Sequence, residues 1–179
     1  TALWRVDGAE VGRMQQHGYI AFDGRTSYAY IPITVYGWQG ITIEQLTYLP
    51  PAKGNAEYYS KTTSIGRPWH GEPGFVVETA SREVAYEPYA VFVYVYGGSA
   101  RWDVWLGLGQ YVGTWVHLVF TYDAQTRTAR YYLNGLLAAE YRLPEGSRTV
   151  LDVDPSTNTC FQRMGLGAAC DGTHSYFAV

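Results

Sequence analysis

The 179-residue chain is poor in charge. Charged residues make up 16% of it, against roughly 25% in an average domain. Only two of its thirteen basic residues are lysines, Lys53 and Lys61, and the net charge at pH 7 is −3. Because the basic residues are scattered, we expect no nucleic-acid partner. Tyr, Thr, Ser, Asn and Gly must cover the surface instead, which is typical of extracellular proteins and of binding faces.

Long hydrophobic runs and helical patterns are also absent from the sequence. No stretch approaches the roughly 18 apolar residues of a membrane span, so we expect no membrane insertion. No window has apolar residues at the i, i+3, i+4, i+7 spacing of an amphipathic helix. The chain begins at Thr1 without a basic and apolar leader, which leaves two alternatives open: a removed signal segment or an excised module.

Short β-branched and aromatic runs, separated by Gly, Pro, Asn and Asp, fill the chain. Without a linker or a repeat, its length suits one domain over residues 1–179. The many runs at roughly ten-residue spacing predict an all-β antiparallel sandwich or barrel. The predicted strands are residues 2–6, 19–22, 27–31, 41–48, 75–79, 90–96, 102–106, 116–122, 129–133, 136–142, 149–153 and 175–179.

The central region gives the clearest local pattern. Apolar residues alternate with more polar ones over residues 116–122, which indicates a strand with one strongly apolar face. Asn134-Gly135 predicts a hairpin, because both central residues of a type I′ turn need positive φ. The side chains expected in the core or at its edge are Trp115, Leu118, Phe120, Tyr131 and Leu133.

Residues 113–123 (GTWVHLVFTYD) and 131–135 (YYLNG) resemble the core signature of laminin G-like domains of the concanavalin A-like lectin/glucanase superfamily. Residues 20–24 (IAFDG), with Tyr28 and Ile31, are similar to an early Phe-Asp-Gly stretch of that family, and residues 3–5 (LWR) to its opening strand. The resemblance implies an antiparallel two-sheet jelly-roll sandwich. It leaves function open among glycan-binding modules, adhesion domains, structural subunits and glucanases.

The chain departs from the family pattern at its C-terminal end. Family domains usually finish with a long Asp-Val-Arg-hydrophobic-Tyr strand, whereas residues 176–179 (YFAV) end this sequence. A sandwich that lacks its last strand leaves unpaired backbone groups and an open apolar groove. We expect residues 1–14, or a strand from a neighbouring copy, to fill the groove. Pairing between copies would assemble the chain into filaments or lattices.

The sequence predicts no catalytic residues and no enzyme. Retaining glucanases of this fold place carboxylates at alternating positions of one strand. Here Glu78, Glu83 and Glu87 are spaced by five and four residues, and residues 102–105 (WDVW) contain a single acid. No Gly-x-Ser-x-Gly motif occurs. His117 lies in the middle of a predicted strand, where we expect a half-buried ring bonded to a backbone carbonyl.

One cluster of oxygen ligands would suit a hard cation. Asp152, Asp154 and Asn158 are the candidate calcium ligands, although Asp and Asn also favour turns and the spacing matches no standard loop. No other cofactor is predicted. We expect Cys160 and Cys170 to form one disulfide outside the cell, with a pair of free thiols as the alternative.

Exposed aromatic side chains are the candidates for sugar binding, since an aromatic face packs against the C–H side of a pyranose ring. They are Trp38, Tyr58, Tyr59, Trp69 and His70, and the alternative is that each packs a loop or caps the core. The sequence favours a non-catalytic extracellular module at a cell or virion surface, or secreted. Two function classes stay open: a subunit that assembles with copies of itself or within a larger surface assembly, and a glycan- or protein-binding adhesion domain.

Overall fold

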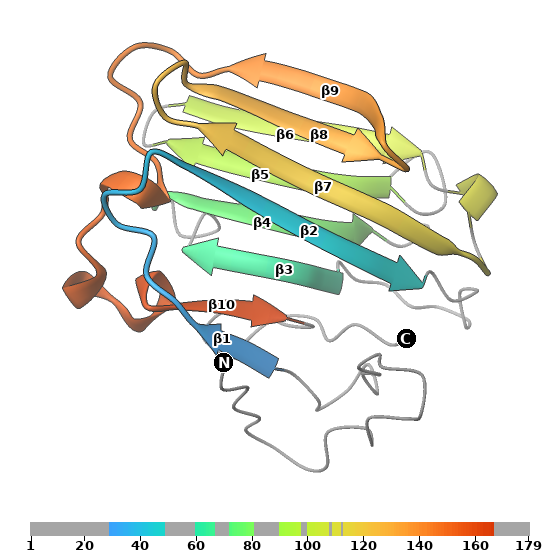
Figure 1. Cartoon of the computed structure of the whole chain (residues 1–179), viewed down its shortest axis with the longest axis horizontal. Helices are drawn as coiled ribbons and strands as arrows, with labels where there is room; N and C mark the ends of the chain where they lie inside the picture. The colour runs from blue at the N-terminus through green and yellow to red at the C-terminus, as the bar shows by residue number, and fades with distance from the viewer. Residues whose placement is uncertain are drawn as a thin grey trace.

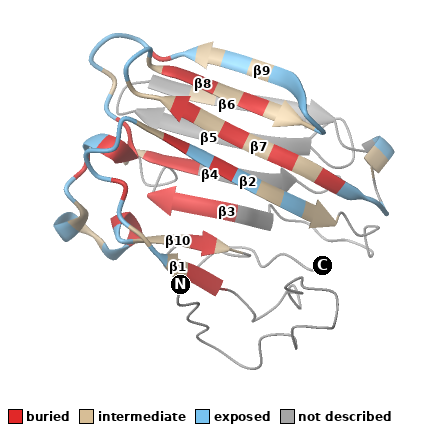
Figure 2. Ribbon diagram, viewed as in Figure 1, coloured by how far each residue is buried: buried red, intermediate tan, exposed pale blue. Residues whose placement is uncertain are grey.

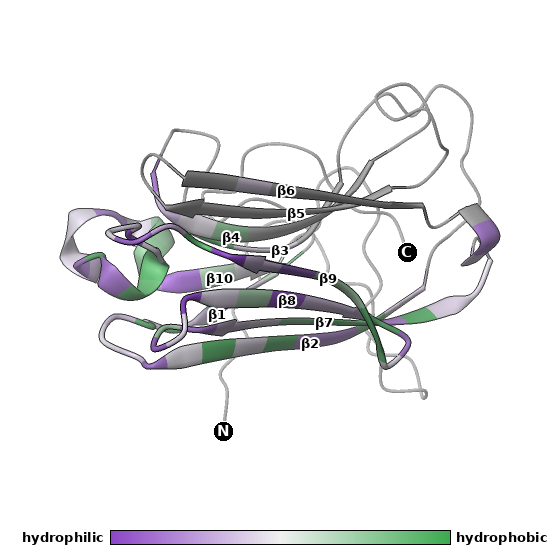
Figure 3. Ribbon diagram, turned by 90° about the horizontal axis from the view of Figure 1, so that it is seen from above, coloured by the Kyte–Doolittle hydropathy of each residue, from purple (hydrophilic) through white to green (hydrophobic). Residues whose placement is uncertain are grey.

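Two antiparallel β-sheets lie face to face in the protein (Figure 1). The computed structural model describes residues 29–48, 60–66, 72–80, 90–97, 100–107, 109–111 and 113–166. Within these residues, one sheet has six strands in the order β1-β10-β3-β4-β5-β6, and the other has four in the order β2-β7-β8-β9. Figure 3 shows the sheets edge-on as two layers. The predicted fold, an antiparallel two-sheet sandwich, is confirmed.

The strands are numbered in the order in which they occur in the sequence. The six-stranded sheet consists of β1 (Ala29–Pro32), β3 (Ser60–Gly66), β4 (Gly74–Ala80), β5 (Ala90–Gly97), β6 (Ala100–Gly107) and β10 (Arg163–Leu166). The four-stranded sheet consists of β2 (Gly40–Tyr48), β7 (Trp115–Asp123), β8 (Thr128–Leu133) and β9 (Leu136–Arg142). The 3₁₀ turns of the described ranges are η2 (Gly109–Tyr111), η3 (Val150–Asp152), η4 (Pro155–Thr157) and η5 (Thr159–Phe161). None of the helices in the described ranges has the length and hydropathy to cross a membrane.

Strand β7 alternates between buried and partly exposed side chains, as its sequence predicts (Figure 2). Its inward residues Val116, Leu118 and Phe120 are at most 1% exposed. The ring of Phe75, from β4 of the opposite sheet, lies 4.9 Å from that of Phe120 between centroids. Because the two sheets meet through these rings, an alanine at Phe120 would cost roughly 3–5 kcal/mol.

The predicted hairpin forms between β8 and β9. Asn134 and Gly135 have φ values of 49° and 80°, as a type I′ turn requires. Beyond the hairpin, β9 lies near β6 at the edge of the opposite sheet, where Tyr141 stacks on Trp102 with 5.4 Å between ring centroids. This stack ties together one edge of each sheet.

The core is closed at one end by the segment between β9 and β10. Leu143, Val150, Leu151 and Phe161 of this segment are at most 4% exposed. In Figure 1 the turns η3, η4 and η5 lie together at the left end of the sandwich, beside the connection from β1 to β2. We call this part of the molecule the loop end, defined by residues 33–39 and 143–162.

Two sequence predictions about the fold are corrected, and two strands were missed. The predicted strand 149–153 is the turn η3 (Val150–Asp152) with its two cap residues, because the side chains of Thr149 and Asp152 form a capping box. Strands β3 and β10 were not predicted. Trp115 is 45% exposed rather than in the core, because side chains alternate between the two faces of β7 and Val116, the next residue, is the one that is buried. Predicted strands 2–6, 19–22 and 175–179 lie outside the described residues.

Candidate functional site

The turn η3 is held by a reciprocal pair of hydrogen bonds. The main-chain N–H of Thr149 donates to Oδ2 of Asp152 at 2.7 Å, and the N–H of Leu151 donates to Oγ1 of Thr149 at 3.3 Å. Such a capping box satisfies the N–H groups that a short helical turn leaves free. The side chain of Asp152 is therefore used to fix the backbone of η3.

The two following turns are capped in the same way. Oδ1 of Asp154 accepts the N–H of Ser156 at 2.8 Å, and Oδ1 of Asn158 accepts the N–H of Cys160 at 2.9 Å. The hydrogen bond from Ser156 holds the pKa of the Asp154 carboxyl below its usual range. The loop between β9 and β10 is thus a series of capped turns with a fixed backbone.

These caps explain the three residues predicted as calcium ligands. Asp152, Asp154 and Asn158 each direct a side-chain oxygen at a backbone N–H of their own turn. Across the described ranges, no group of three or more His, Cys, Asp and Glu side chains is arranged to hold a metal ion. The preference of Asp and Asn for turns accounts for the pattern, and calcium binding stays an unsupported prediction.

A cavity of about 220 Å³ opens beside these turns. Its apolar lining comes from Pro73, which precedes β4, and from Val153 and Phe161. The polar residues that line it in the described part of the chain are Glu72, Arg148, Thr157 and Asn158. The cavity therefore combines an apolar surface with charged and amide groups, as small-molecule sites do.

Two aromatic side chains are exposed on the neighbouring connection from β1 to β2. Tyr36 is 56% and Trp38 is 45% exposed. They flank Gly37, which has φ +76° and donates its N–H to the carbonyl oxygen of Leu151 in η3 at 2.8 Å. The turn is closed by the N–H of Trp38, which donates to the carbonyl of Val35 at 3.1 Å. The loop end therefore presents both aromatic rings and the cavity.

Of the predicted sugar-binding residues, only Trp38 falls within the described part, and it is exposed at the loop end. Tyr58, Tyr59, Trp69 and His70 lie outside the described residues. Tyr36 and Arg148 were missed by sequence reasoning. The position of Tyr36 beside a glycine next to Trp38 is the signal that could have identified it.

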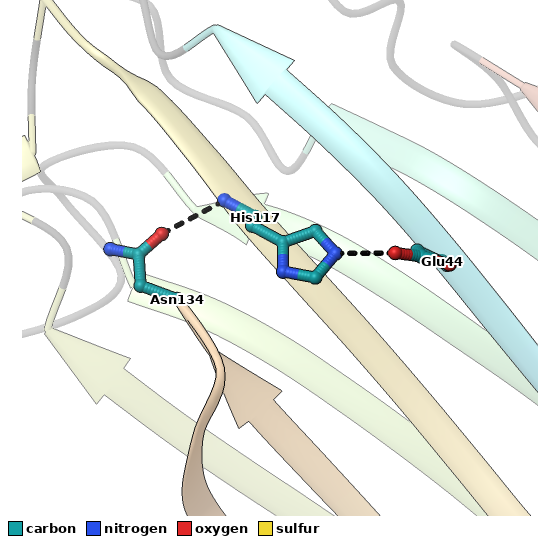
Figure 4. Close-up of polar contacts among 3 residues, drawn as sticks. All are labelled: Glu44, His117 and Asn134. Carbon is teal, nitrogen blue, oxygen red and sulfur yellow. Dashed lines mark hydrogen bonds and ion pairs between the residues drawn. The ribbon is translucent and has the colours of Figure 1, made fainter.

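A second polar group lies on the outer face of the four-stranded sheet (Figure 4). Nε2 of His117 in β7 lies 2.7 Å from Oε1 of Glu44 in β2. The main-chain N–H of His117 donates to Oδ1 of Asn134 in the hairpin at 3.0 Å. The ring is half-exposed as predicted, but its partner is a carboxylate rather than the expected backbone carbonyl. The Glu44–His117 pair is open to solvent and lines no described cavity.

The remaining predictions are tested only in part. Cys160 is 1% exposed in η5 and is not a free thiol. Cys170 lies outside the described residues, so its pairing with Cys160 stays a prediction. Glu78 lies in β4, but its side chain is not described, and Glu83 and Glu87 fall outside the described residues.

A sequence profile described as the Concanavalin A-like lectin/glucanases superfamily matches residues 23–172 of the chain. No curated protein sequence matches it significantly. Among solved structures, tailspike protein 2 of Escherichia coli O157:H7 bacteriophage CAB120 is similar with a TM-score of 0.59 and 10% identity. That match covers 98% of this chain and 23% of the tailspike, so the chain spans about a quarter of that protein's length.

Two further structures are similar over most of both chains. The CBM40 of Ruminococcus gnavus IT-sialidase has a TM-score of 0.56 and 14% identity, and the match covers 98% of this chain and 82% of that one. The β-glucanase of Bacillus licheniformis has a TM-score of 0.52 and 13% identity, with coverage of 100% and 81%. Identities this low show a shared fold, while the profile match extends over most of the sequence. The chain belongs to the concanavalin A-like lectin/glucanases superfamily.

Proposed function

We propose that the chain is a non-catalytic extracellular glycan-binding module whose site is the loop end. The cavity beside η3, η4 and η5 is the observation that carries the proposal. Its apolar surface of Pro73, Val153 and Phe161 suits the C–H groups of a sugar ring, and its polar residues suit the hydroxyl groups. Two features favour an extracellular location. The sequence has few charged residues, and Cys160 is not a free thiol.

Preorganisation of the loop end supports binding. The backbone around the cavity is fixed by the caps of Asp152, Asp154 and Asn158. The connection that carries Trp38 is fastened to η3 through Gly37. Ordering a loop on binding costs free energy, so a loop that is already ordered binds a given ligand more tightly.

A catalytic role is the alternative within the same family. Glycoside hydrolysis needs two carboxyl groups about 5–10 Å apart, one as acid and one as nucleophile or base. Among the described residues that line the cavity, Glu72 is the single carboxylate, and the sequence has no Glu-x-Asp pattern along a strand. These features favour binding over hydrolysis.

Self-assembly through terminal strands, the other class that the sequence leaves open, depends on residues 1–14 and 175–179. Both segments lie outside the described residues. Assembly stays a prediction, and it is independent of the loop end.

A glycan array tests the proposed function, with two tryptophan variants as a matched pair. Trp38 at the loop end and Trp115 on the outer sheet face are both 45% exposed. We expect the wild type to bind at least one glycan class. Trp38→Ala should raise the Kd for that glycan by about tenfold, which is about 1.4 kcal/mol. Trp115→Ala should leave the Kd unchanged. Binding of no glycan, or a loss confined to Trp115→Ala, would overturn the proposal.

A further inference from the structure

Arg148 brings unused hydrogen-bond donors to the cavity. An arginine side chain has five N–H donors in a planar fork. Nη2 of Arg148 donates to the main-chain oxygen of Asp152 at 3.2 Å, and this is its one side-chain hydrogen bond to the described part of the chain. No carboxylate of the described residues forms an ion pair with it, and the side chain is exposed. Its positive charge is therefore available to a ligand.

Asn158 adds donors of fixed orientation. Its Oδ1 atom accepts the N–H of Cys160 at 2.9 Å, and this bond holds the amide plane in place. The Nδ2 group has no hydrogen bond to the described residues, so both of its protons are available. Asn158 and Arg148 line the same cavity. The cavity therefore has unpaired donors on two of its polar residues.

The other polar lining residues offer acceptors. The hydroxyl proton of Thr157 is donated to the main-chain oxygen of Asp154 at 2.7 Å, so its oxygen presents lone pairs alone. Glu72 contributes a carboxylate to the lining, and this residue has an interaction of its own. A ligand that fits this lining accepts hydrogen bonds through a charged group and donates them through hydroxyls.

The size of the cavity limits the ligand. At about 220 Å³ it is smaller than the roughly 300–1,000 Å³ of pockets for drug-sized ligands. Its apolar lining by Pro73, Val153 and Phe161 provides a surface for one ring. This volume suits a single terminal sugar residue rather than the middle of an extended chain.

We infer that the cavity binds one carboxylated sugar residue, with its carboxylate on Arg148 and Asn158. The inference rests on the proposed glycan-binding function and names its ligand class. Guanidinium and carboxylate form charge-assisted, often bidentate hydrogen bonds, which are the strongest that a protein surface offers. A terminal uronic acid and a terminal sialic acid both carry the required group.

Calorimetric titration with a matched pair of probes tests the inference. Methyl glucuronide and methyl glucoside differ at C6 alone, where the glucuronide has a carboxylate and the glucoside a hydroxymethyl group. Methyl sialoside distinguishes a sialic from a uronic source. We expect one acidic probe to bind at least tenfold more tightly than the glucoside, and the preference to weaken in salt because the charges are partly exposed. Arg148→Gln should abolish the preference, and Arg148→Lys should restore part of it.

Arg142→Gln is the control variant, since Arg142 is exposed and does not line the cavity. It should retain the preference, and all variants should melt at the wild-type temperature. Equal affinity for acidic and neutral probes would overturn the inference and leave glycan binding intact. An acidic preference that survives Arg148→Gln would overturn the role of Arg148. If no probe and no array glycan binds, the proposed function fails as well.

Discussion

The main-chain N–H of Gly37 lies 2.8 Å from the carbonyl oxygen of Leu151, and this hydrogen bond joins the connection from β1 to β2 to the turn η3. Leu151 is 2% exposed, so the bond also fastens the aromatic connection to the core. On one side it holds the backbone of the connection that carries Trp38, and on the other it is attached to η3, the first of the turns beside the cavity. The two parts of the proposed site therefore share one scaffold.

The hydroxyl group of Tyr131 is buried and has no hydrogen-bond partner among the residues that the structure describes. Burial also raises the pKa of this phenol. Because an unsatisfied buried hydroxyl opposes folding, we expect Tyr131→Phe to keep the free energy of unfolding or raise it by up to about 1 kcal/mol. Denaturant titration of this variant checks the prediction, with Tyr132→Phe on the outer sheet face as control. A loss of more than about 1 kcal/mol would show that the hydroxyl has a partner.

Asp123 gives a pH-dependent prediction. Its carboxylate accepts the N–H groups of Thr126 and Gln125 at the turn after β7, and these bonds lower its pKa. The pKa of Asp123 in the folded protein is thus below the unfolded value of about 3.9. The carboxylate therefore stabilises the fold fully above about pH 3.9, and this stabilisation is lost as the pH falls through the folded pKa. Asp123→Ala should be less stable than the wild type at pH 7 and approach it at pH 3. A gap that stays constant in denaturation curves at both pH values contradicts this.

The disulfide between Cys160 and Cys170 stays a prediction that mass spectrometry can test. Its closure of a ten-residue loop is worth roughly 2–3 kcal/mol in the chain-entropy model. Cys160 lies in η5 between Asn158 and Phe161, both of which line the cavity. We expect Cys170→Ser to lower the free energy of unfolding by that amount. Two thiols that react freely with an alkylating reagent in the native wild type would refute the bridge.

Self-association through a terminal strand is tested by truncation. If residues 1–14 or 175–179 pair with a neighbouring copy, the intact chain should form oligomers that grow with concentration. Deletion of the pairing segment should leave a folded monomer. Sedimentation analysis measures both states, and a monodisperse intact monomer at high concentration would reject the prediction.

The sandwich was predictable from the sequence where side chains alternate. In β7 the inward Val116, Leu118 and Phe120 show the period of two directly, and Asn134-Gly135 marks the hairpin that follows. The same period of two places Trp115 on the outer face of the sheet. The expectation that it lies in the core or at its edge came from the large, apolar side chain of tryptophan.

Two strands escaped prediction because their burial depends on distant partners. Strand β3 buries Thr63 and Ser64 as well as Ile65, so its sequence shows little hydrophobic contrast. Strand β10 has four residues, and its pairing with β1 joins segments far apart in the sequence. No local pattern encodes such pairing.

The loop end could be predicted only in pieces. Trp38 was identified by its residue type. Asp152, Asp154 and Asn158 were identified by their oxygens, which cap the turns of this loop, and their binding of calcium stays a prediction. The cavity depends on Glu72 and Pro73 meeting residues 148–161, and a contact between segments this far apart has no signature in the sequence.

Backbone chemical-shift mapping tests the central claim most directly, because it locates the ligand as well as detecting it. The tightest-binding array glycan would be titrated into isotope-labelled wild-type protein. The proposed function predicts the largest shift changes at Arg148 and Asn158, which line the cavity, and at Trp38 on the neighbouring connection. Changes centred on Trp115 and His117 of the outer sheet face, with the loop end unaffected, would contradict it.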